Sequence, residues 1–282
     1  MTNYVVYDVF TDKIFGGNQL AVFPDAASLP QDQLQKIAAE FNFSEVTFVY
    51  PPENSDHTVK VRIFTPTSEV DFAGHPVIGT IIALAKLGYN APMVLELGVG
   101  PLACTLKNGM AAFTATVPLQ KIVAPRPELV AKALCLPASA INQKTHAPIQ
   151  ASLGLPFAIV ELDSRNSLAK CQPKTEVIRE CAALYPAGLD FAIFAYIRDG
   201  DKITSRMFAP LDNIPEDPAT GSASATLAAL LTEISGEPQK LHFTQGEDMG
   251  RPSYIKASTT LNPISVTIAG KAIQTMTGRF II

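Results

Sequence analysis

The spacing of apolar residues predicts alternating strands and helices in the first half of the chain. Apolar residues at helical spacing, introduced by a serine and an early proline, predict a helix over about 30–41. The small, apolar segment 77–87 predicts a largely buried helix. Runs rich in β-branched and aromatic residues, separated by turn residues, predict two hairpins. Their strands are expected at 4–10 with 19–23 and at 43–50 with 58–64.

The second half repeats this alternation of strands and helices. Segment 246–251 contains two glycines but leads into a strand-like run, so it predicts a tight turn between strands and no phosphate-binding loop. The small-residue segment 223–231 again suits a buried helix. The other elements expected are helices over 127–134 and 176–184 and strands at 157–160, 190–197 and 202–208.

A short motif, Arg-x-Phe-x-Pro, occurs once in each half. It begins at Arg62 and at Arg206, and each copy leads to an aspartate, Asp71 or Asp217. A glycine and a small-residue helix then follow in both halves. This shared order favours a duplication and predicts two related domains. Their expected limits are residues 1–120 and 125–265.

Composition and charge exclude several classes of protein. Of 282 residues, 47% are hydrophobic and 17% charged, which predicts a large folded core. The net charge is −4 and lysines and arginines occur singly, so we expect no nucleic acid partner. Met1 leads directly into strand-like residues, without the basic start and apolar run of a signal peptide, and no apolar segment reaches spanning length. We therefore expect a cytoplasmic protein with no membrane partner.

The histidines and cysteines lack the spacing of a metal or disulfide site. The four histidines have no i, i+4 partner and no nearby cysteine, so no metal is expected. The four cysteines form no Cys-x-x-Cys motif and would stay thiols in a reducing compartment. A dinucleotide fingerprint and a Gly-x-Ser-x-Gly elbow are also absent from the sequence. We therefore expect chemistry that uses no cofactor.

Two glycine-containing loops precede the small-residue helices. Loops 71–75 and 217–222 would each present backbone N–H groups at the positive end of a helix dipole. If the two halves are related by a pseudo-two-fold axis, both loops can point into one cleft and bind a carboxylate. The alternative is a structural role, with glycines in tight turns and Ser222 capping a backbone amide.

Glu45 and His75 are the titratable residues with the strongest functional signal. Strand alternation places Glu45 on one face with Phe43 and Thr47. Apolar surroundings raise the pKa of a carboxyl group, which suits a group that must accept and return a proton near neutrality. His75 follows Gly74 at a predicted helix start, where the dipole favours the neutral imidazole. The alternatives are an edge-strand glutamate that faces water and a structural histidine.

Five blocks along nearly the whole chain carry a family resemblance. They are Asp8-Val9-Phe10 with Gly17-Asn18, Ser44-Glu45, residues 71–76, residues 217–223 and residues 245–253. In this order they resemble the phenazine-biosynthesis PhzF-like family, relatives of diaminopimelate epimerase. The resemblance implies an α+β fold of two pseudo-symmetric domains, each a curved, mostly antiparallel sheet around a central helix. It also implies a cleft between the domains, a return of segment 272–282 to the first domain, and a homodimer.

The same resemblance implies residue roles and a reaction. The epimerase relatives use paired cysteine bases, but this chain has Ala73 and Pro218 at the corresponding motifs, which disfavours a thiol mechanism. Implied instead are Glu45 as general acid/base, Asp217 and His75 as its assistants, and Ser44, Gly74, Gly221 and Ser222 as substrate-binding residues.

Two functional hypotheses follow. The first is an isomerase that moves a proton within a small carboxylated metabolite, such as a cyclic amino or hydroxy acid, by cofactor-independent catalysis. The family's named reaction is of this kind and moves a proton within a dihydro-hydroxyanthranilate ring. The second is a catalytically weak paralogue that binds a small molecule.

Overall fold

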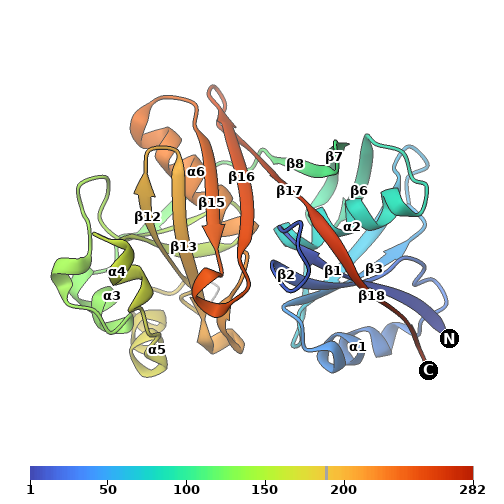
Figure 1. Ribbon diagram of the computed structural model, residues 1–282, viewed down its shortest axis with the longest axis horizontal. Helices are drawn as coiled ribbons and strands as arrows, with labels where there is room; N and C mark the ends of the chain where they lie inside the picture. The colour runs from blue at the N-terminus through green and yellow to red at the C-terminus, as the bar shows by residue number, and fades with distance from the viewer. Residues whose placement is uncertain (188–189, 282) are drawn as a thin grey trace. The chain divides into compact units, whose positions relative to one another are not determined.

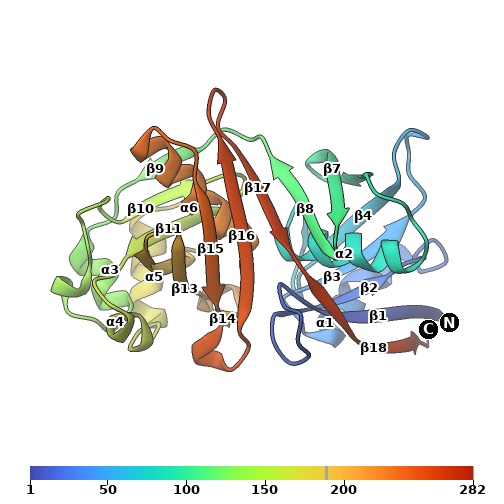
Figure 2. The same ribbon diagram turned by 45° about the horizontal axis from the view of Figure 1, so that its top comes forward.

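The computed structural model describes residues 1–187 and 190–281. By its internal contacts the chain divides into two units, Met1–Thr114 with Ile268–Ile282 and Ala115–Thr267. Figures 1 and 2 label the helices and strands of both units. Each unit contains a hydrophobic core of its own. Among the described helices, none has both the length and the apolar character needed to cross a membrane.

The first unit is built on a mostly antiparallel sheet. Its strands are β1 (Thr2–Val9), β2 (Asn18–Phe23), β3 (Glu45–Tyr50), β4 (Val59–Phe64), β5 (Glu69–Val70), β6 (Met93–Leu97), β7 (Gly100–Lys107), β8 (Met110–Ala115) and β18 (Ala272–Phe280). β1 pairs with β18 on one side and with β2 on the other, and β2 continues to β3 and β4. The pairs β2–β3 and β4–β6 are parallel. The last strand thus completes the sheet that the first strand begins.

A buried helix, α2 (Gly74–Lys86), packs against β1, β2, β3 and β7. Gly79 allows this close approach, because a Cβ atom there would lie 2.5 Å from Leu20 Cδ2 and 2.8 Å from Val9 Cγ2. Farther along the interface, Thr47 Oγ1 and Thr80 Oγ1 share a hydrogen bond of 3.1 Å. α2 is therefore the central helix expected for this unit.

The other face of the same strands packs against α1 (Leu34–Phe41). Leu34 and Ile37 of the helix join Phe23 and Phe48 of β2 and β3 in one hydrophobic cluster. Because side chains alternate along a strand, these residues face away from α2. The two faces of the sheet are thus covered by different helices (Figure 1).

The second unit has a second mostly antiparallel sheet. Its elements are β9 (Gln120–Val123), α3 (Pro127–Ala133), η2 (Ala138–Ala140), β10 (Ile149–Ser152), β11 (Pro156–Glu161), α4 (Arg165–Ala169), α5 (Thr175–Leu184), β12 (Ile193–Asp199), β13 (Lys202–Ala209), η3 (Pro210–Asp212), β14 (Ile214–Asp217), α6 (Gly221–Ser235), β15 (Lys240–Gln245), η4 (Glu247–Met249) and β16 (Ser253–Thr260). The strand β17 (Ser265–Gly270) begins in this unit and ends in the first one. The strands pair in the order β9, β10, β11, β12, β13, β15, β16, and β11–β12 and β13–β15 are parallel. α6 is the buried helix of this sheet and contacts β10, β11 and β16.

The sequence predictions of local structure are largely confirmed. Both hairpins of the first half form, as β1–β2 and β3–β4. The helix expected over 30–41 opens with a 3₁₀ turn, η1 (Gln31–Gln33), before α1 begins. The helix expected over 77–87 begins earlier, at Gly74, because a proline is tolerated in a first turn where its missing N–H would have no helical partner.

The Arg-x-Phe-x-Pro motif has the same local structure in both units. The guanidinium carbon lies 5.0 Å from the ring centroid of the phenylalanine for Arg62 and 4.8 Å for Arg206. Each arginine also donates two hydrogen bonds to one glutamate, Glu69 at 2.6 Å or Glu216 at 2.8 Å. A shared local structure of this kind supports the duplication inferred from the sequence.

Candidate active site

The first unit brings four of the predicted site residues together. Glu45 is the first residue of β3, and His75 lies in the first turn of α2, directly after Gly74. His75 Nδ1 is 3.5 Å from Glu45 Oε2. Parallel pairing of β2 with β3 brings the start of β2 close to Ser44 and Glu45. The strand β3 lies between β2 and β4, so it is not an edge strand, and the Glu45 side chain is only 16% exposed, so the water-facing alternative is wrong.

Asn18 links this group and was not assigned a role from the sequence. It is the first residue of β2 and is buried. Its amide nitrogen lies 3.5 Å from His75 Nδ1, and its amide oxygen accepts a hydrogen bond of 3.4 Å from Ser44 Oγ. The sequence signal was its place directly after Gly17, whose φ of +62° turns the chain into β2.

Burial determines the protonation state of His75. The residue is only 4% exposed, and desolvation lowers the pKa of its imidazole to about 3, although a backbone contact with Gln19 acts in the opposite direction. His75 is therefore neutral at physiological pH, and its contact with Glu45 is not an ion pair. The sequence also predicted a neutral imidazole, but from the helix dipole, whereas the cause in the structure is desolvation.

The second unit brings together the other predicted residues. Asp217 ends β14 and is 5% exposed, and Gly221 and Ser222 open α6. Asp217 Oδ2 accepts a hydrogen bond of 2.6 Å from Thr220 Oγ1. Gln245, at the end of β15, donates a hydrogen bond of 2.8 Å to the backbone carbonyl of Asp217. Thr220 and Gln245 were not assigned roles from the sequence, although Gln245 lies in one of the family blocks.

Both helix starts lack a side-chain cap within the described residues. Ala73 is the N-cap of α2 and Thr220 is the N-cap of α6, and neither makes a capping hydrogen bond through its side chain. Ser222 lies inside the first turn, so the alternative in which it caps α6 is wrong. Backbone N–H groups at an uncapped helix start are suited to binding an anion.

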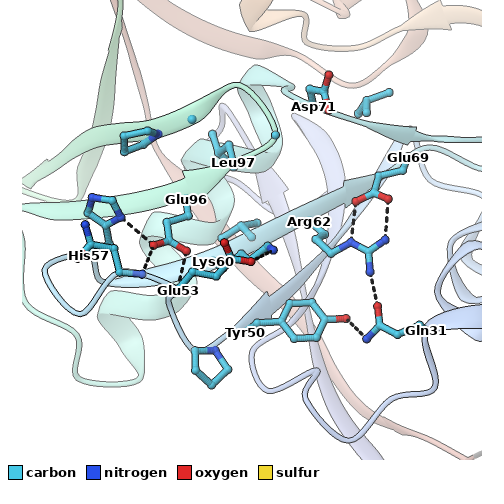
Figure 3. A pocket seen from close by; sticks show the side chains of 17 residues that line it. Gln31, Tyr50, Glu53, His57, Lys60, Arg62, Glu69, Asp71, Glu96 and Leu97 are labelled. Atoms are coloured by element: carbon cyan, nitrogen blue, oxygen red, sulfur yellow. Dashed lines mark hydrogen bonds and ion pairs between the residues drawn. The ribbon is translucent and has the colours of Figure 1, made fainter.

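Asp71 lies apart from the predicted catalytic residues. It is exposed, unlike Asp217, and lines a hollow of about 890 Å³ in the first unit (Figure 3). Gly98 packs against it, since a Cβ atom at Gly98 would lie 2.3 Å from Asp71 Oδ1. The two aspartates after the repeated motif therefore differ in environment.

The charged groups that line this hollow are paired with one another. Arg62 pairs with Glu69 and Lys60 with Glu53. The carboxylate of Glu96 accepts hydrogen bonds of 2.8 Å from the backbone N–H groups of Glu53 and Asn54, which, with His57, lower its pKa to about 2. These contacts fix the 53–57 turn, and the hollow contains none of the predicted catalytic residues.

Three of the four cysteines are buried and do not suit a thiol mechanism, whereas Cys135 is exposed. Cys104, Cys171 and Cys181 are buried, and desolvation raises the pKa of their thiols to about 12, about 12 and about 11, respectively. These thiols are therefore protonated near neutral pH. In the described part of the chain, no group of three or more His, Cys, Asp or Glu residues could hold a metal ion.

Comparison with solved structures defines the class of the fold. The chain matches a PhzF-family phenazine biosynthesis protein of Bacillus anthracis with a TM-score of 0.89 and 24% identity, covering 100% of this chain and 99% of that one. It also matches a probable proline racemase of Agrobacterium radiobacter with a TM-score of 0.67 and 12% identity, covering 100% and 93%. At these identities the matches show the fold, which is the α+β, diaminopimelate epimerase-like fold expected from the sequence.

The family follows from the sequence comparisons. The family model described as phenazine biosynthesis-like protein, PhzC-PhzF, matches residues 7–278. A trans-2,3-dihydro-3-hydroxyanthranilate isomerase of Pseudomonas fluorescens is 36% identical over 268 residues, which cover 91% of this chain and 90% of that protein. The chain therefore belongs to the PhzC-PhzF family of phenazine biosynthesis-like proteins, and its class of enzyme is isomerase.

Proposed function

We propose that the protein moves a proton within a small carboxylated metabolite by acid/base catalysis with Glu45 and without a cofactor. The observation that carries this proposal is the contact between Glu45 and a buried, neutral His75 at the uncapped start of α2. A neutral imidazole can orient a carboxylate or a substrate without competing for its proton.

In the proposed reaction the carboxylate of Glu45 removes a proton from a carbon atom of the substrate. The electron pair of the broken C–H bond moves into the conjugated system, and the protonated Glu45, whose proton can exchange with solvent, then gives a proton to another carbon to form a new C–H bond. The reaction is a net isomerisation with no oxidant or reductant. Glu45 must therefore pass through both protonation states in every turnover.

Substrate binding in this proposal uses the two helix starts. The backbone N–H groups at Gly74, Gly221 and Ser222 would bind the substrate carboxylate, because helix N-termini stabilise negative charge. Ser44 and Asn18 hold the polar group around His75 on one side of the reacting atoms. Asp217 would assist the proton transfer.

The substrate class proposed is a cyclic, unsaturated amino or hydroxy acid. The name of the Pseudomonas fluorescens relative specifies trans-2,3-dihydro-3-hydroxyanthranilate, a ring of this chemistry. That compound is therefore the first substrate to test, followed by other cyclic acids with a double bond next to an acidic C–H bond.

The test is proton exchange in deuterated water. The protein is incubated with each acid, and the incorporation of solvent deuterium and the change in ring structure are followed by NMR. Isomerised product from the wild type, and none from Glu45→Gln, is the expected result. Tight binding of an acid with no exchange and no isomerisation would instead support the alternative of a binding paralogue.

A further inference from the structure

Gln245 lies at the centre of a buried hydrogen-bond network around Asp217. The glutamine is fully buried at the end of β15. Its Oε1 accepts a hydrogen bond of 3.2 Å from the backbone N–H of Thr220. Its Nε2 donates hydrogen bonds of 2.8 Å to the Asp217 carbonyl and 2.9 Å to Thr220 Oγ1. The whole amide is thus used to hold the turn between β14 and α6.

The orientation of this amide is fixed by its backbone partners. A backbone N–H can only donate, so the amide atom that faces Thr220 N must be the oxygen. A backbone carbonyl can only accept, so the atom that faces the Asp217 carbonyl must be the nitrogen. A flipped Gln245 amide would lose both contacts. The direction of each hydrogen bond in the network is therefore determined.

The same argument fixes the direction in which the hydroxyl group of Thr220 donates its proton. Because Oγ1 already accepts a hydrogen bond from Gln245, its own proton is left for Asp217 Oδ2, 2.6 Å away. A proton on that Oδ2 would make Thr220 Oγ1 accept two hydrogen bonds and would leave the hydroxyl proton with no acceptor in the hydrogen bonds of the described residues. An unsatisfied hydrogen-bond donor is unfavourable in a buried position such as this one.

We propose that Thr220 and Gln245 are positioning residues that keep Asp217 Oδ2 unprotonated, so that Asp217 enters the reaction as a carboxylate. This inference rests on the proposed function, in which Asp217 assists Glu45. It separates the two carboxyl groups by role: Glu45 exchanges its proton with the substrate, whereas Asp217 begins each turnover as a carboxylate.

Two acidic residues close in sequence to Asp217 and Gln245, namely Glu216 and Asp248, contact Arg206 and take no part in the network around Asp217. Glu216 precedes Asp217 in β14 and is bound by Arg206 of β13 through two hydrogen bonds of 2.8 Å. Asp248 is 3.8 Å from the same guanidinium. Thr220 and Gln245 take part in none of these contacts, so changing either residue removes none of the bonds to Arg206.

Ser205 provides a matched control. Its Cα is the register partner of Gln245 across the parallel β13–β15 pair, and the residue is 1% exposed. Its Oγ makes no hydrogen bond within the described residues. Ser205→Ala therefore removes a buried hydroxyl beside the network without removing any of its bonds.

The first experiment measures the protonation of Asp217 without a substrate. Protein labelled with ¹³C at the aspartate carboxyl groups is titrated by NMR, and the Asp217 signal is assigned with Asp217→Asn. Thr220→Val should raise the protonation midpoint by about one pH unit, the usual effect of one hydrogen bond to a charged group. Thr220→Ser, which retains the hydroxyl, and Ser205→Ala should match the wild type.

A second variant, Gln245→Met, tests the inference if Thr220→Val does not fold. Gln245→Met leaves the Thr220 hydroxyl in place but frees it to rotate, so the midpoint should rise by a smaller amount. An unchanged midpoint in either folded variant, or an equal rise in Ser205→Ala, would overturn the inference.

Activity provides the second readout. The proposed role needs Asp217 as a carboxylate, so activity is lost as the pH falls through its midpoint, and Thr220→Val should move the acid limb of kcat to higher pH by the same amount. KM at high pH should change little. A shifted NMR midpoint in a protein with no isomerase activity would refute the proposed function and leave the protonation state of Asp217 established. An unshifted acid limb in active Thr220→Val would refute the role given to Asp217.

Discussion

At the scale of single residues, burial separates groups that have the same chemistry. His75 is buried against Glu45 and has a strongly lowered pKa, whereas the side chain of His242 is 52% exposed. Glu45 has a neutral neighbour, while Glu216 is held by a permanently charged arginine. The two carboxyl groups therefore have different electrostatic surroundings, although they have the same chemistry.

Glu45→Gln should abolish proton transfer while the fold is retained. Glutamine has nearly the same shape and hydrogen-bonding capacity, but it cannot exchange a proton. Since general acid/base assistance contributes about 100- to 10,000-fold, turnover should fall by at least this factor. Deuterium incorporation measures the loss, and circular dichroism checks the fold. A folded variant with wild-type exchange would remove Glu45 from the mechanism.

The lowered pKa of His75 should make the protein less stable in acid. The unfolded chain binds a proton at this histidine below about pH 6.5, whereas the folded protein does so only below about 3. Between these values the unfolded state binds more protons, so the free energy of unfolding falls as the pH falls, by about 1.4 kcal/mol per pH unit from this group. Denaturant unfolding at several pH values measures the slope.

His75→Gln should flatten this dependence, and His242→Gln is the matched control that should leave it unchanged. An equal slope in wild type and His75→Gln would show that His75 is not neutral in the folded protein. The ¹⁵N chemical shifts of the imidazole give an independent measurement of the same protonation state.

At the scale of elements, close packing of α2 on the sheet depends on one glycine. Gly79→Ala would place a methyl group within 2.5 Å of Leu20 and 2.8 Å of Val9, so one of these side chains or the helix itself must move. We expect a loss of about 1–3 kcal/mol, the usual cost of overpacking a core. Thermal or urea unfolding measures it. Lys86→Ala, at the exposed end of the same helix, should be close to neutral, and an equally neutral Gly79→Ala would contradict the close contact.

The two arginines of the repeated motif should differ in their importance for stability. Arg206 is buried and, besides Glu216, donates hydrogen bonds of 3.0–3.2 Å to the carbonyl groups of Leu168, Ala169 and Cys171 at the end of α4. Lysine cannot make this planar set of contacts. Arg206→Lys should therefore cost about 3 kcal/mol, whereas Arg62→Lys, in a more exposed pair, should cost less than about 1 kcal/mol. Equal losses in urea unfolding would contradict this assignment.

The sequence predicted individual helices and hairpins better than it predicted the contacts between residues that are far apart in the chain. Periodic apolar residues were sufficient for the β1–β2 hairpin and for α6, because both depend on neighbours close in the chain. The network of Thr220 and Gln245 depends on the parallel β13–β15 register, which joins residues far apart in sequence. The signal that was available was a glutamine at the end of a strand, directly before a glycine turn. Likewise, no local pattern could separate buried Asp217 from exposed Asp71.

At the scale of the whole molecule, the two units differ in how the chain builds them. The second unit is one continuous stretch, Ala115–Thr267, whereas the first unit combines Met1–Thr114 with Ile268–Ile282. In the first unit, β18 pairs with β1 along its length, from Thr2 with Phe280 to Val9 with Ala272. The duplication of the two halves stays a prediction, tested by superposing one unit on the other.

Removal of residues 272–282 should destabilise the first unit selectively. β1 would lose its partner on one side, and Phe280 would be lost from the aromatic cluster with Phe23 and Phe41. Hydrogen exchange measured by mass spectrometry should show faster exchange in β1 and β2, while β11 to β13 keep their protection. Equal protection of β1 in the shortened and full chains would contradict the importance of this pairing.

The pairing of the first strand with the last also has a consequence for synthesis on the ribosome. The second unit has all its residues before β18 leaves the exit tunnel, so it can fold while translation continues. The first unit is synthesised earlier, but one edge of β1 stays unpaired until residues 272–280 have been synthesised. The unit that contains Glu45 therefore completes its sheet last, and nascent chains that stall before β18 expose a strand edge that chaperones would have to protect.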